Sequence, residues 1–461
     1  MFTQGQVYAT QVMNYGYHCF LTGDAGTGKS FVIREFVNNK INENKNVMVV
    51  APTGLAAYNV NGVTMHRAFN APVAPITSIY DTSKVDDTII ETDILVIDEI
   101  STCRIDLFEY TVKKVFTANS IRKNRGKKPI QLIVCGDFFQ LPPVITDFDR
   151  IKLNEYYGRD VGQGFCFESD YWKMFNFKVI ILTEVVRQDN KDFVEKLNKL
   201  RIGDRTHLDY FYKNSSKNEI LYAVNLYGTN KEVDKRNQME IDRIPGQLFE
   251  YNDIMDEGLL ASECRTEEVL RLKVGARVMT TLNSKEGAYI NGSIATVVDC
   301  QPDLIGLKFV NGHYVYVQRE EFEVYQYELV EDFNGNDTLE RKVIGSFKQF
   351  PIRLAYAITI HKSQGQTFDA INLNPYSWDC GQLYVAISRV RELSKLHFNY
   401  EPDMKYAVTS LNVIKFYNSI VRTANQYVEP IKEEVKELTE KEKSIQRDMD
   451  ILEGLFKNIG R

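Results

Sequence analysis

Residues Gly23–Ser30 have the sequence GDAGTGKS, which fits the phosphate-loop pattern G-x-x-x-x-G-K-[ST] at every fixed position. In this pattern the glycines let the loop pass close to bound phosphates, backbone N–H groups cradle them, Lys29 reaches the β and γ oxygens and Ser30 ligates magnesium. The stretch therefore predicts a site for a nucleoside triphosphate. Its predicted nucleotide-binding residues are Gly23, Gly26, Thr27, Gly28, Lys29 and Ser30.

The flanking sequence supports this interpretation. HCFLT, which ends at Thr22, predicts a short buried strand, and SFVIREFVNNK carries apolar residues at helical spacing. A strand, a loop and a helix in this order place the phosphates at a helix N-terminus, which favours anions. Asp24 is unusual here, because a carboxylate beside a triphosphate is repulsive unless it points away, so we expect it to point outward.

The composition limits the class of protein. With 461 residues and 44% apolar composition, the chain has room for about two to four domains with cores of ordinary size. No run approaches the ~20 apolar residues of a membrane helix, and the N-terminus lacks the features of a signal peptide. Seven widely spaced cysteines lack metal-ligand spacing and indicate buried thiols. We therefore expect a cytoplasmic protein that contacts no membrane.

The net charge of −6 argues against a protein that coats nucleic acid by bulk electrostatics, but it leaves room for a local basic groove. The clearest basic cluster is IRKNRGKK at residues 121–128, for which a solvated loop without a partner is the simpler interpretation.

Two carboxylates follow an apolar run in ILVIDEIS. A buried parallel strand here delivers Asp98 and Glu99 to the C-terminal edge of its sheet, where ligands of open α/β folds bind. Asp98 is predicted to hold magnesium and Glu99 to polarise the attacking water. Such a run is common alone, but it is specific when it follows a phosphate loop.

Further segments supply candidate groups around a bound triphosphate. The strand QLIVCG leads into DFFQLPPV, where Gln140 is predicted to sense the γ-phosphate. Arg187, in LTEVVRQ, is a candidate charge stabiliser, although a single arginine is normally a surface charge. The helical segment LYVAISRVR carries Arg389 near its end, and the strand PIRLAYAITI leads into the polar loop HKSQGQTFD, which contains Gly365.

Other loops are candidates for contact with nucleic acid. The strand NVMVVA and the following APTGLAA present Thr53 where a phosphodiester fits, and Thr64 and His66 follow on a second loop. Turn chemistry with a packed histidine is the alternative interpretation.

The second half begins near residue 190, where EILYAVN predicts the first strand of a second α/β domain. Between about residues 289 and 350, short alternating runs separated by Asn-Gly pairs predict a small inserted β-barrel. Its tyrosines are either a stacking face for bases or part of an ordinary half-buried sheet. Residues 430–461 predict an amphipathic helix that packs on its own chain or forms a coiled coil.

Taken together, these segments resemble superfamily-one helicases, and more closely the Pif (petite integration frequency) family, with Dda and RecD-type helicases as relatives. The resemblance runs from about Phe2 to Tyr400. Nine motifs appear in the family's order: GDAGTGKS, APTGLAA, TMHRAF, IDEIS, GDFFQLPPV, LTEVVRQ, YGTNKEVDKRN, HKSQGQTFD and QLYVAISRV.

The resemblance implies an α/β fold with two RecA-like parallel-sheet lobes, a small inserted pin subdomain and a small inserted β-barrel. The expected boundaries are 1–63 and 91–188 for the first lobe, 64–90 for the pin, 189–286 and 351–429 for the second lobe, 287–350 for the barrel and 430–461 for the C-terminal helix. The expected cofactors are ATP and Mg²⁺.

The resemblance also assigns residue roles. Gln6 matches an adenine-reading glutamine, and Arg187 and Arg389 match two arginine fingers from the second lobe. Residues that face single-stranded DNA are Thr53, Thr64, His66, His361 and Lys362. Three departures weaken the subfamily assignment: Val186 replaces a frequent aromatic residue, Arg67 replaces a small one, and the region after Asp106 fits loosely.

The implied function is an ATP-dependent DNA helicase that travels 5′-to-3′ on single-stranded DNA and unwinds duplex or forked DNA. We expect a monomer, associated with the nucleoid and of bacterial or phage origin, that meets replication or repair proteins. A P-loop kinase with a small acceptor is one alternative, and a nucleic-acid clamp whose affinity ATP controls is another.

Overall fold

The computed structural model describes residues 2–77, 81–188, 190–259, 267–284, 286–333, 335–376 and 379–421. The predicted C-terminal helix at residues 430–461 and one cysteine, Cys264, lie outside the described residues.

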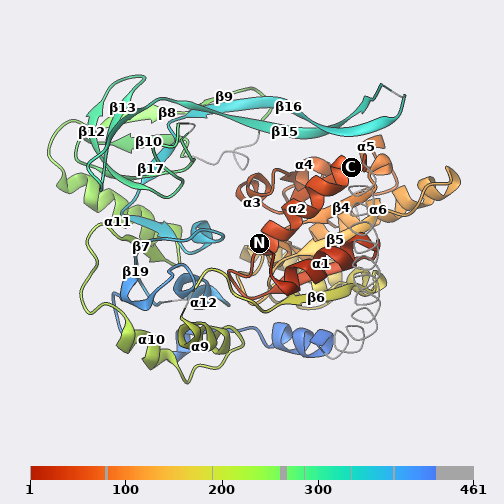
Figure 1. Ribbon diagram of the computed structural model, residues 1–461, viewed down its shortest axis with the longest axis horizontal. Helices are drawn as coiled ribbons and strands as arrows, with labels where there is room; N and C mark the ends of the chain where they lie inside the picture. The colour runs from red at the N-terminus through yellow and green to blue at the C-terminus, as the bar shows by residue number, and fades with distance from the viewer. Residues whose placement is uncertain are drawn as a thin grey trace, which may run out of the picture.

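A six-stranded parallel sheet forms the centre of the first half of the chain, in the order β3-β2-β4-β5-β1-β6. Its strands are β1 (Cys19–Gly23), β2 (Val47–Ala51), β3 (Val63–Thr64), β4 (Ile94–Ile97), β5 (Gln131–Cys135) and β6 (Lys178–Leu182). We call this sheet and the helices packed on it the first α/β unit (Figure 1).

The two faces of this sheet belong to two separate hydrophobic cores. Phe20, Val50 and Leu95 pack into one core, whereas their neighbours Leu21 and Val49 pack into the other. Because successive side chains of a strand point to opposite faces, strands covered on both sides have continuous apolar sequences. This burial explains why β1, β2, β4 and β5 were predictable from apolar runs alone.

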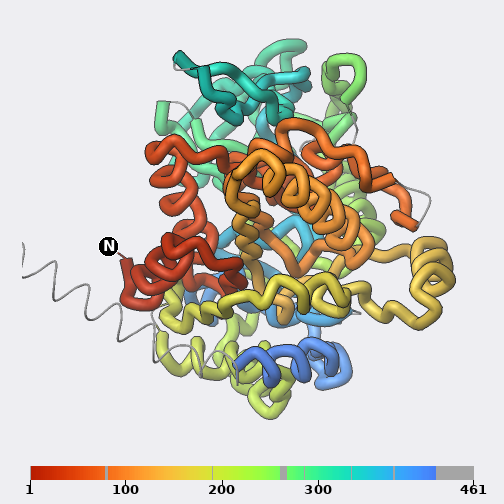
Figure 2. Tube along the Cα trace, turned by 90° about the vertical axis from the view of Figure 1, so that its right-hand side faces the viewer, coloured from red at the N-terminus to blue at the C-terminus, as the bar shows by residue number. Residues whose placement is uncertain are grey.

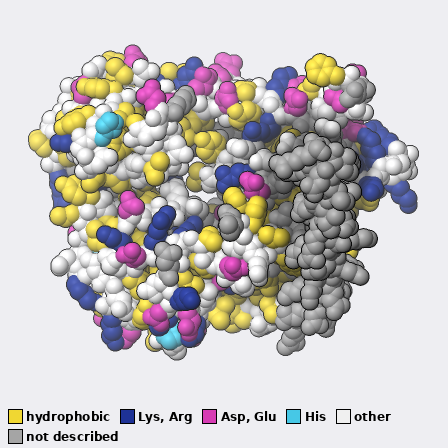
Figure 3. All heavy atoms as spheres, viewed as in Figure 1, with side chains coloured by type: hydrophobic (Ala, Val, Ile, Leu, Met, Phe, Trp, Pro, Cys, Tyr) yellow, Lys and Arg dark blue, Asp and Glu magenta, His cyan; other side chains and the backbone are white. Residues whose placement is uncertain are grey.

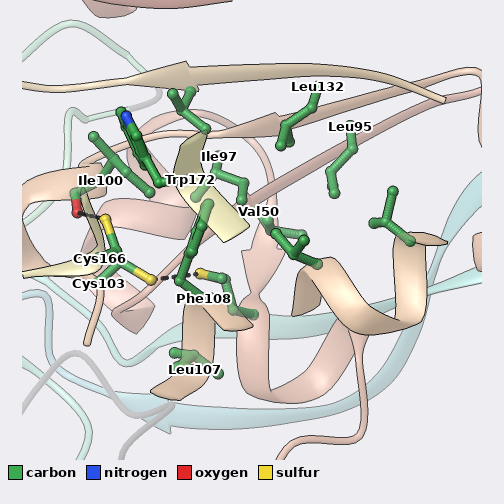
Figure 4. Packing of buried hydrophobic residues seen from close by; sticks show 14 of the residues in the cluster. Val50, Leu95, Ile97, Ile100, Cys103, Leu107, Phe108, Leu132, Cys166 and Trp172 are labelled. Atoms are coloured by element: carbon green, nitrogen blue, oxygen red, sulfur yellow. Dashed lines mark hydrogen bonds between the residues drawn. The ribbon is translucent and has the colours of Figure 1, made fainter. Parts of the chain in front are cut away.

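Helices cover each face of the first sheet. α1 (Gln4–Asn14) and α2 (Lys29–Asn42) contribute to one core. α6 (Ile105–Asn124) and α8 (Asp170–Met174) contribute to the other, part of which Figure 4 shows. The shorter helices are α3 (Gly54–Asn59), α4 (Met65–Ala68), α5 (Asp87–Glu91) and α7 (Asp147–Tyr157).

We expect Phe108→Ala to lower the free energy of unfolding by about 3–5 kcal/mol, the usual cost of truncating a fully buried aromatic side chain. Phe108 is 0% exposed, and its ring centroid lies 5.6 Å from that of Trp172. Urea denaturation followed by circular dichroism measures the change. Phe148→Ala is the matched control, because Phe148 is 63% exposed on α7 and its truncation should cost no more than about 0.5 kcal/mol. Equal losses in the two variants would contradict the assigned packing.

The second half contains a four-stranded parallel sheet in the order β18-β7-β19-β20. Its strands are β7 (Val224–Tyr227), β18 (Ala357–Thr359), β19 (Ile371–Leu373) and β20 (Leu396–Phe398). The helices are α9 (Lys191–Arg201), α10 (Leu208–Asn214), α11 (Asn230–Arg243) and α12 (Gln382–Ile387). We call this assembly the second α/β unit; it lies beside the first one (Figure 1).

Two strand predictions in this unit were wrong in detail. The segment EILYAVN was expected to be one strand, but β7 begins only at Val224, because Leu221 is 82% exposed and Tyr222 has a left-handed φ of 63°. PIRLAYAITI was also expected to be one strand. It forms β17 (Ile352–Leu354) in an antiparallel sheet and then β18 in the parallel sheet.

Antiparallel strands fill the region where a small barrel was expected. A five-stranded sheet has the order β14-β13-β12-β11-β17, and a two-stranded sheet pairs β10 with β8. These strands share one core. They are β8 (Phe249–Asn252), β10 (Val269–Leu272), β11 (Arg277–Thr280), β12 (Ile294–Cys300), β13 (Ile305–Phe309) and β14 (Tyr314–Val317). The shared core thus begins before residue 287, the boundary that the sequence suggested.

The last part of the expected barrel is instead a long hairpin of β15 (Glu320–Glu331) and β16 (Asp337–Gln349), with β9 (Ile254–Met255) at its base. The hairpin extends along the top of Figure 1 from the antiparallel sheets to the first unit near α5. There the Val49 N–H donates to the Tyr327 hydroxyl at 2.8 Å, and Asn46 bonds the backbone of β16. The hairpin thereby ties the antiparallel sheets to the first unit.

The chain ends its described part on the first unit. A helix over residues 411–421 lies below β6 in Figure 1 and under the first unit in Figure 2. Its Val413 and Tyr417 are buried in the same core as Phe20. The two units are therefore connected both by the chain after β6 and by this returning helix.

The basic cluster at residues 121–128 is partly helical and forms ion pairs within the fold, which corrects the prediction of a solvated loop without a partner. Its first residues extend α6, and Arg122 is 2% exposed and pairs with Asp93 at 2.9 Å. Lys127 pairs with Glu91. On the face shown in Figure 3, Lys and Arg side chains alternate with Asp and Glu side chains. Among the described residues, no helix is both long and apolar enough to cross a bilayer.

Candidate nucleotide site and adjoining groove

A cavity lies between the two α/β units, at the C-terminal ends of β1, β4 and β5. Of the nucleotide and catalytic residues predicted from sequence, the following line it: Gly26, Gly28, Lys29, Ser30, Asp98, Glu99, Gln140, Arg187, Gly365 and Arg389. The structure therefore brings predicted residues from segments more than 350 residues apart to one cavity. Gly23, Thr27 and Gln6 do not line the cavity but lie directly behind it.

The phosphate loop needs glycine at two positions because of its backbone and its neighbours. Gly26 and Gly28 have φ angles of 81° and 82°, a left-handed conformation that disfavours side chains. A Cβ atom on Gly26 would lie 2.6 Å from the Arg187 side chain, and one on Gly28 would lie 2.6 Å from Gln6 Nε2. The loop therefore fits closely against both the N-terminal helix and the chain that leaves β6.

Gln6 supports the loop from α1. Its Nε2 donates to the Thr27 carbonyl at 3.0 Å, and its Oε1 accepts from Thr3 N–H at 3.0 Å. One N–H and one oxygen lone pair of the amide remain for other partners. The expected adenine contact thus stays a prediction, and the observed contacts make Gln6 a support for the loop.

Lys29 begins α2 and folds back over the loop. Its Nζ donates to the carbonyls of Gly23 at 2.9 Å and Asp24 at 3.0 Å. These bonds hold the ammonium group at the cavity wall, where a triphosphate would meet it. The carboxylate of Asp24 does not point to solvent as expected: it is 15% exposed and pairs with Arg201.

Ser30 and Asp98 form a donor set suited to a hard cation. The Ser30 hydroxyl bonds the Asp98 carboxylate, and both residues line the cavity. Mg²⁺ prefers oxygen ligands and is usually held through one or two protein groups together with phosphate and water. Burial raises the pKa of Asp98, because water no longer stabilises the charged carboxylate. A bound cation would stabilise that charge instead.

Glu99 lies directly after β4 in a strained conformation. Its φ and ψ are 50° and 43°, the left-handed region that a residue with a side chain rarely adopts. Such strain is concentrated at functional sites. Burial, followed by the charge of Asp98, raises the pKa of Glu99, and Gln364 Nε2 donates to its Oε2 at 3.0 Å.

Gln140 lies beside Glu99 at the end of the segment that follows β5. Gln364 Nε2 also lies 3.5 Å from Gln140 Oε1. The side chain of Gln140 turns back toward Asp137, with 3.4 Å between Nε2 and Oδ2. The three side chains of Glu99, Gln140 and Gln364 thus form one polar group across the two units.

The two predicted arginine fingers come from different places, which corrects one expectation. Arg389 follows α12 of the second unit, but Arg187 follows β6 of the first unit. Arg187 reaches the second unit through Nη1, which lies 3.3 Å from the Ser388 carbonyl. Both side chains nevertheless line the cavity with Lys29, so they share one site.

Arg389 is 1% exposed and is held by its own unit. Its Nε donates to the Val385 carbonyl at 2.8 Å, and its Nη1 donates to the Ser363 carbonyl at 3.1 Å. Burial, followed by the charge of Arg187, lowers the pKa of Arg389 to about 9. Its guanidinium donates to carbonyl and hydroxyl oxygens, and the carboxylate of Glu99 acts on it through its charge.

A groove adjoins the cavity. Thr53, His66 and His361 of the predicted DNA contacts line it, together with the two prolines Pro142 and Pro143. Thr64 does not line the groove; its hydroxyl caps α4 by accepting from Arg67 N–H. Lys362 is exposed beside His361 and is also outside the lining. Burial lowers the pKa values of His66 and His361.

Sequence reasoning missed several residues of the site. Gln364 lines the groove and contacts Glu99; Phe31, Thr367 and Arg391 line the cavity. Each lies within two residues of a predicted one, so adjacency to Ser30, Gly365 and Arg389 was the only available signal. No local pattern states which way these side chains point.

Known proteins match most of the chain. The model of the PIF1-like helicase family matches residues 3–207. The ATP-dependent DNA helicase Pif1 of Campylobacter jejuni is 28% identical over 434 residues, which cover 87% of this chain and 93% of that protein. The ATP-dependent DNA helicase PIF1 of Danio rerio is 31% identical over 428 residues, which cover 88% of this chain but only 62% of that protein.

Solved structures of this family match as well. Bacteroides Pif1 in complex with ADP-AlF4 is 29% identical, with a TM-score of 0.77 over 92% of this chain and 98% of that one. Bacteroides Pif1 bound to single-stranded DNA, and a structure of two coordinating Pif1 helicases that addresses unwinding of forked duplex DNA, each match with a TM-score of 0.65. The chain belongs to the PIF1-like helicase family, and it is an ATP-dependent DNA helicase.

Proposed function

We propose that this helicase hydrolyses ATP in the cavity between its α/β units, travels 5′-to-3′ on single-stranded DNA held in the adjoining groove, and unwinds forked duplex. One observation supports this most strongly: Glu99 lines both the cavity and the groove. A single carboxylate between the two sites gives bound DNA a short route to the group that activates water.

In this proposal the two α/β units are RecA-like lobes. The first lobe comprises residues 1–63 and 91–188 together with β3 and α4, which pack in its core although they lie in the expected pin segment. The second lobe comprises the four-stranded parallel sheet with α9 to α12, because β8, β10 and β11 of the expected 189–286 segment pack in the antiparallel core. The remainder of residues 64–90 acts as the strand-separating pin, and the antiparallel sheets take the place of the small inserted barrel. The parallel sheets face each other across the cavity, as a motor with a shared nucleotide site requires.

The cavity residues that the sequence predicted have separate roles in the proposed reaction. Lys29 binds the β and γ oxygens, Gln140 senses the γ-phosphate, and Glu99 orients and polarises the attacking water. Ser30 and Asp98 would hold Mg²⁺, which neutralises phosphate charge when it is bound. Gly365 and the loop glycines allow close approach of the phosphates.

Arg187 and Arg389 act on the charge that develops on the γ-phosphoryl group. An arginine finger accelerates such reactions by about 10³ to 10⁵. Because Arg389 belongs to the second unit, hydrolysis requires the units to approach each other. Opening and closing of the two units would then move the DNA contacts of each unit along the strand, independently of its base sequence.

The DNA contacts are proposed at Thr53, Thr64, His66, His361 and Lys362. Thr53 and His66 come from the first unit, and His361 and Lys362 come from the second, so relative motion of the units changes their spacing. Relatives bound to single-stranded DNA and a study of forked duplex support this class of substrate. That last structure involves two coordinating helicases, whereas we propose that this chain acts as a monomer in solution and meets replication or repair proteins.

We propose that Gln364 transmits the effect of bound DNA to Glu99 and thereby stimulates ATP hydrolysis. The Gln364 amide contacts Glu99 and both residues line the groove, so a strand bound there can act on the carboxylate through Gln364. We expect Gln364→Ala to reduce the stimulation of ATPase by single-stranded DNA about tenfold, since a hydrogen bond to a charged group contributes about 1.5–3 kcal/mol. Steady-state ATPase with and without oligonucleotide measures the ratio.

Gln366→Ala is the matched control for this change. Its side chain bonds only the Lys362 carbonyl within the described contacts and lies on the same loop. Stimulation in this variant should equal that of the unmodified protein. Unchanged stimulation in Gln364→Ala would remove Gln364 from the coupling route.

The function is tested with tailed duplexes. We expect unwinding of a duplex with a 5′ single-stranded tail, dependence on ATP, and little unwinding of a duplex with a 3′ tail. A phosphotransferase would show ATPase that is indifferent to DNA, and an ATP-controlled clamp would bind DNA without displacing a strand. The protein would act at the nucleoid in the cytoplasm, and its sequence, rich in Asn, Lys, Ile and Tyr, fits a bacterial or phage source with an AT-rich genome.

A further inference from the structure

We propose that Arg201 of the second unit is a positioning residue that tunes the nucleotide site from behind. In this proposal, which rests on the ATP site described above, Arg201 fixes the phosphate loop through Asp24 and the sensing segment through Asp137. It also offsets the charge of Asp24, which would otherwise repel the triphosphate.

The geometry joins three buried charges. Arg201 Nε and Nη2 donate to the two oxygens of Asp137 at 3.0 and 2.8 Å, and Nη1 lies 3.1 Å from Asp24 Oδ1. The side chains of Arg201, Asp24 and Asp137 are 9%, 15% and 0% exposed. Two carboxylates thus share one guanidinium, and removal of this cation would leave both with only the smaller compensating contribution of Lys29.

Asp24 is an integral part of the phosphate loop. Its carbonyl accepts from Lys29 Nζ at 3.0 Å, and its neighbour Ala25 lines the nucleotide cavity. A negative charge at this position acts on the bound phosphates across a poorly solvated wall, where charges interact more strongly than in water. Arg201 therefore offsets the repulsion between the Asp24 carboxylate and the bound phosphates.

Asp137 gives Arg201 a second route to the site. Its Oδ1 accepts from Phe139 N–H at 3.1 Å, and its backbone carbonyl accepts from Gln140 N–H at 2.9 Å. The guanidinium also lies over the Phe139 ring, 4.5 Å from its centroid. The start of the segment that carries Gln140 is thus fixed by a residue of the other unit.

Arg201 is itself held rigidly. It ends α9, whose Phe193, Leu197 and Leu200 are buried in the core of the second unit. The second unit contacts the same loop again through Tyr384, whose hydroxyl accepts from Ala25 N–H at 2.9 Å. Nucleotide affinity is therefore set by how the second unit sits against the loop, and not by the loop alone.

The test separates charge compensation from a simple structural tie. We measure the Kd of ATP and of ADP by equilibrium titration of the full chain, because this readout does not require DNA unwinding. Asp24→Asn should bind both nucleotides several-fold more tightly than the unmodified protein. Arg201→Gln should bind them about tenfold more weakly, since one compensating charge is lost.

The double variant distinguishes charge compensation from a purely structural role of Arg201. In Arg201→Gln combined with Asp24→Asn, the Kd should return to within about threefold of the unmodified value, because the repelling charge has gone. A merely structural Arg201 predicts no such rescue, so a double variant as weak as Arg201→Gln would overturn the proposal. Equal or weaker binding in Asp24→Asn alone would also overturn it, even if variants at Arg201 fail to fold.

Two further variants complete the design. Arg201→Lys keeps the charge but loses the two-pronged contact with Asp137, so the Kd should stay near normal while kcat falls. Lys199→Gln is the matched control, because Lys199 lies on the same helix and its only ion pair among the described residues is with the exposed Glu195. Its Kd and kcat should not change. Loss of unwinding with this Kd pattern intact would count against the proposed function and leave the role of Arg201 standing.

Discussion

Arg389→Ala is expected to reduce ATP hydrolysis by about 10³ to 10⁵ while nucleotide binding is largely retained. The guanidinium lines the cavity with Lys29 but belongs to the second unit, so its charge acts mainly when the units close on a bound nucleotide. The contacts that hold nucleotide in the open state come from the phosphate loop, which this change does not touch. Single-turnover hydrolysis and equilibrium nucleotide binding measure the two quantities separately.

Burial makes a folding control necessary for this variant. Truncation of Arg389 removes its hydrogen bonds to the carbonyls of Val385 and Ser363 and empties a buried position, and both changes destabilise the fold. Arg389→Lys keeps a cation and one donor at the same position, so it should fold well and still lose most activity, because a lysine cannot reproduce the planar guanidinium. A rate within about threefold of the unmodified protein in both variants would contradict the proposed two-unit mechanism.

The elements best predicted from sequence were those whose signal is local. The phosphate loop, β4 with Asp98 and Glu99, and β5 with its polar extension each combine an apolar run with a chemically specific end. Burial on both faces produces the continuous apolar run, and the sheet edge requires polar residues after it. These segments therefore predicted one site although the chain between them is long.

The wrong strand predictions arose where residues of two different sheets have the same local hydrophobic pattern. Residues Ile352–Thr359 are buried except for the half-buried Arg353 and Tyr356, so their hydrophobicity does not reveal that the chain changes sheets between Leu354 and Ala357. The change is set by distant partners, since Tyr356 bonds Arg277 of one sheet and Asn225 of the other. No pattern within ten residues contains that information.

The residues that join the two units were the hardest to predict. Gln364 and Arg201 have ordinary neighbours, and their roles follow only from partners about 265 and 64 residues away in the chain. Arg187 shows the converse case: it lines the predicted cavity, but the resemblance placed it in the second lobe, whereas it follows β6 at the edge of the first sheet. Contacts between the two units depend on the topology of the fold, and a single sequence does not show that topology.

Lys29→Ala is expected to abolish turnover, with a loss in kcat of at least about 10² to 10³, the cost of removing one preorganised donor from a developing charge. The fold should persist, because the lost hydrogen bonds to the carbonyls of Gly23 and Asp24 lie at a cavity wall that water can reach. Steady-state ATPase with single-stranded DNA present gives the rate, and thermal unfolding checks the fold.

Lys40→Ala on the same helix is the matched control, because the only ion pair of Lys40 within the described contacts is with the exposed Glu43 and Lys40 lies about three turns from the loop. Turnover in that variant should equal that of the unmodified protein. If Lys29→Ala also kept normal ATPase, the phosphate-loop assignment would fail. Every other role proposed in the cavity would then fail with it, because Glu99, Gln140 and Arg389 are assigned relative to the phosphates that Lys29 is proposed to bind.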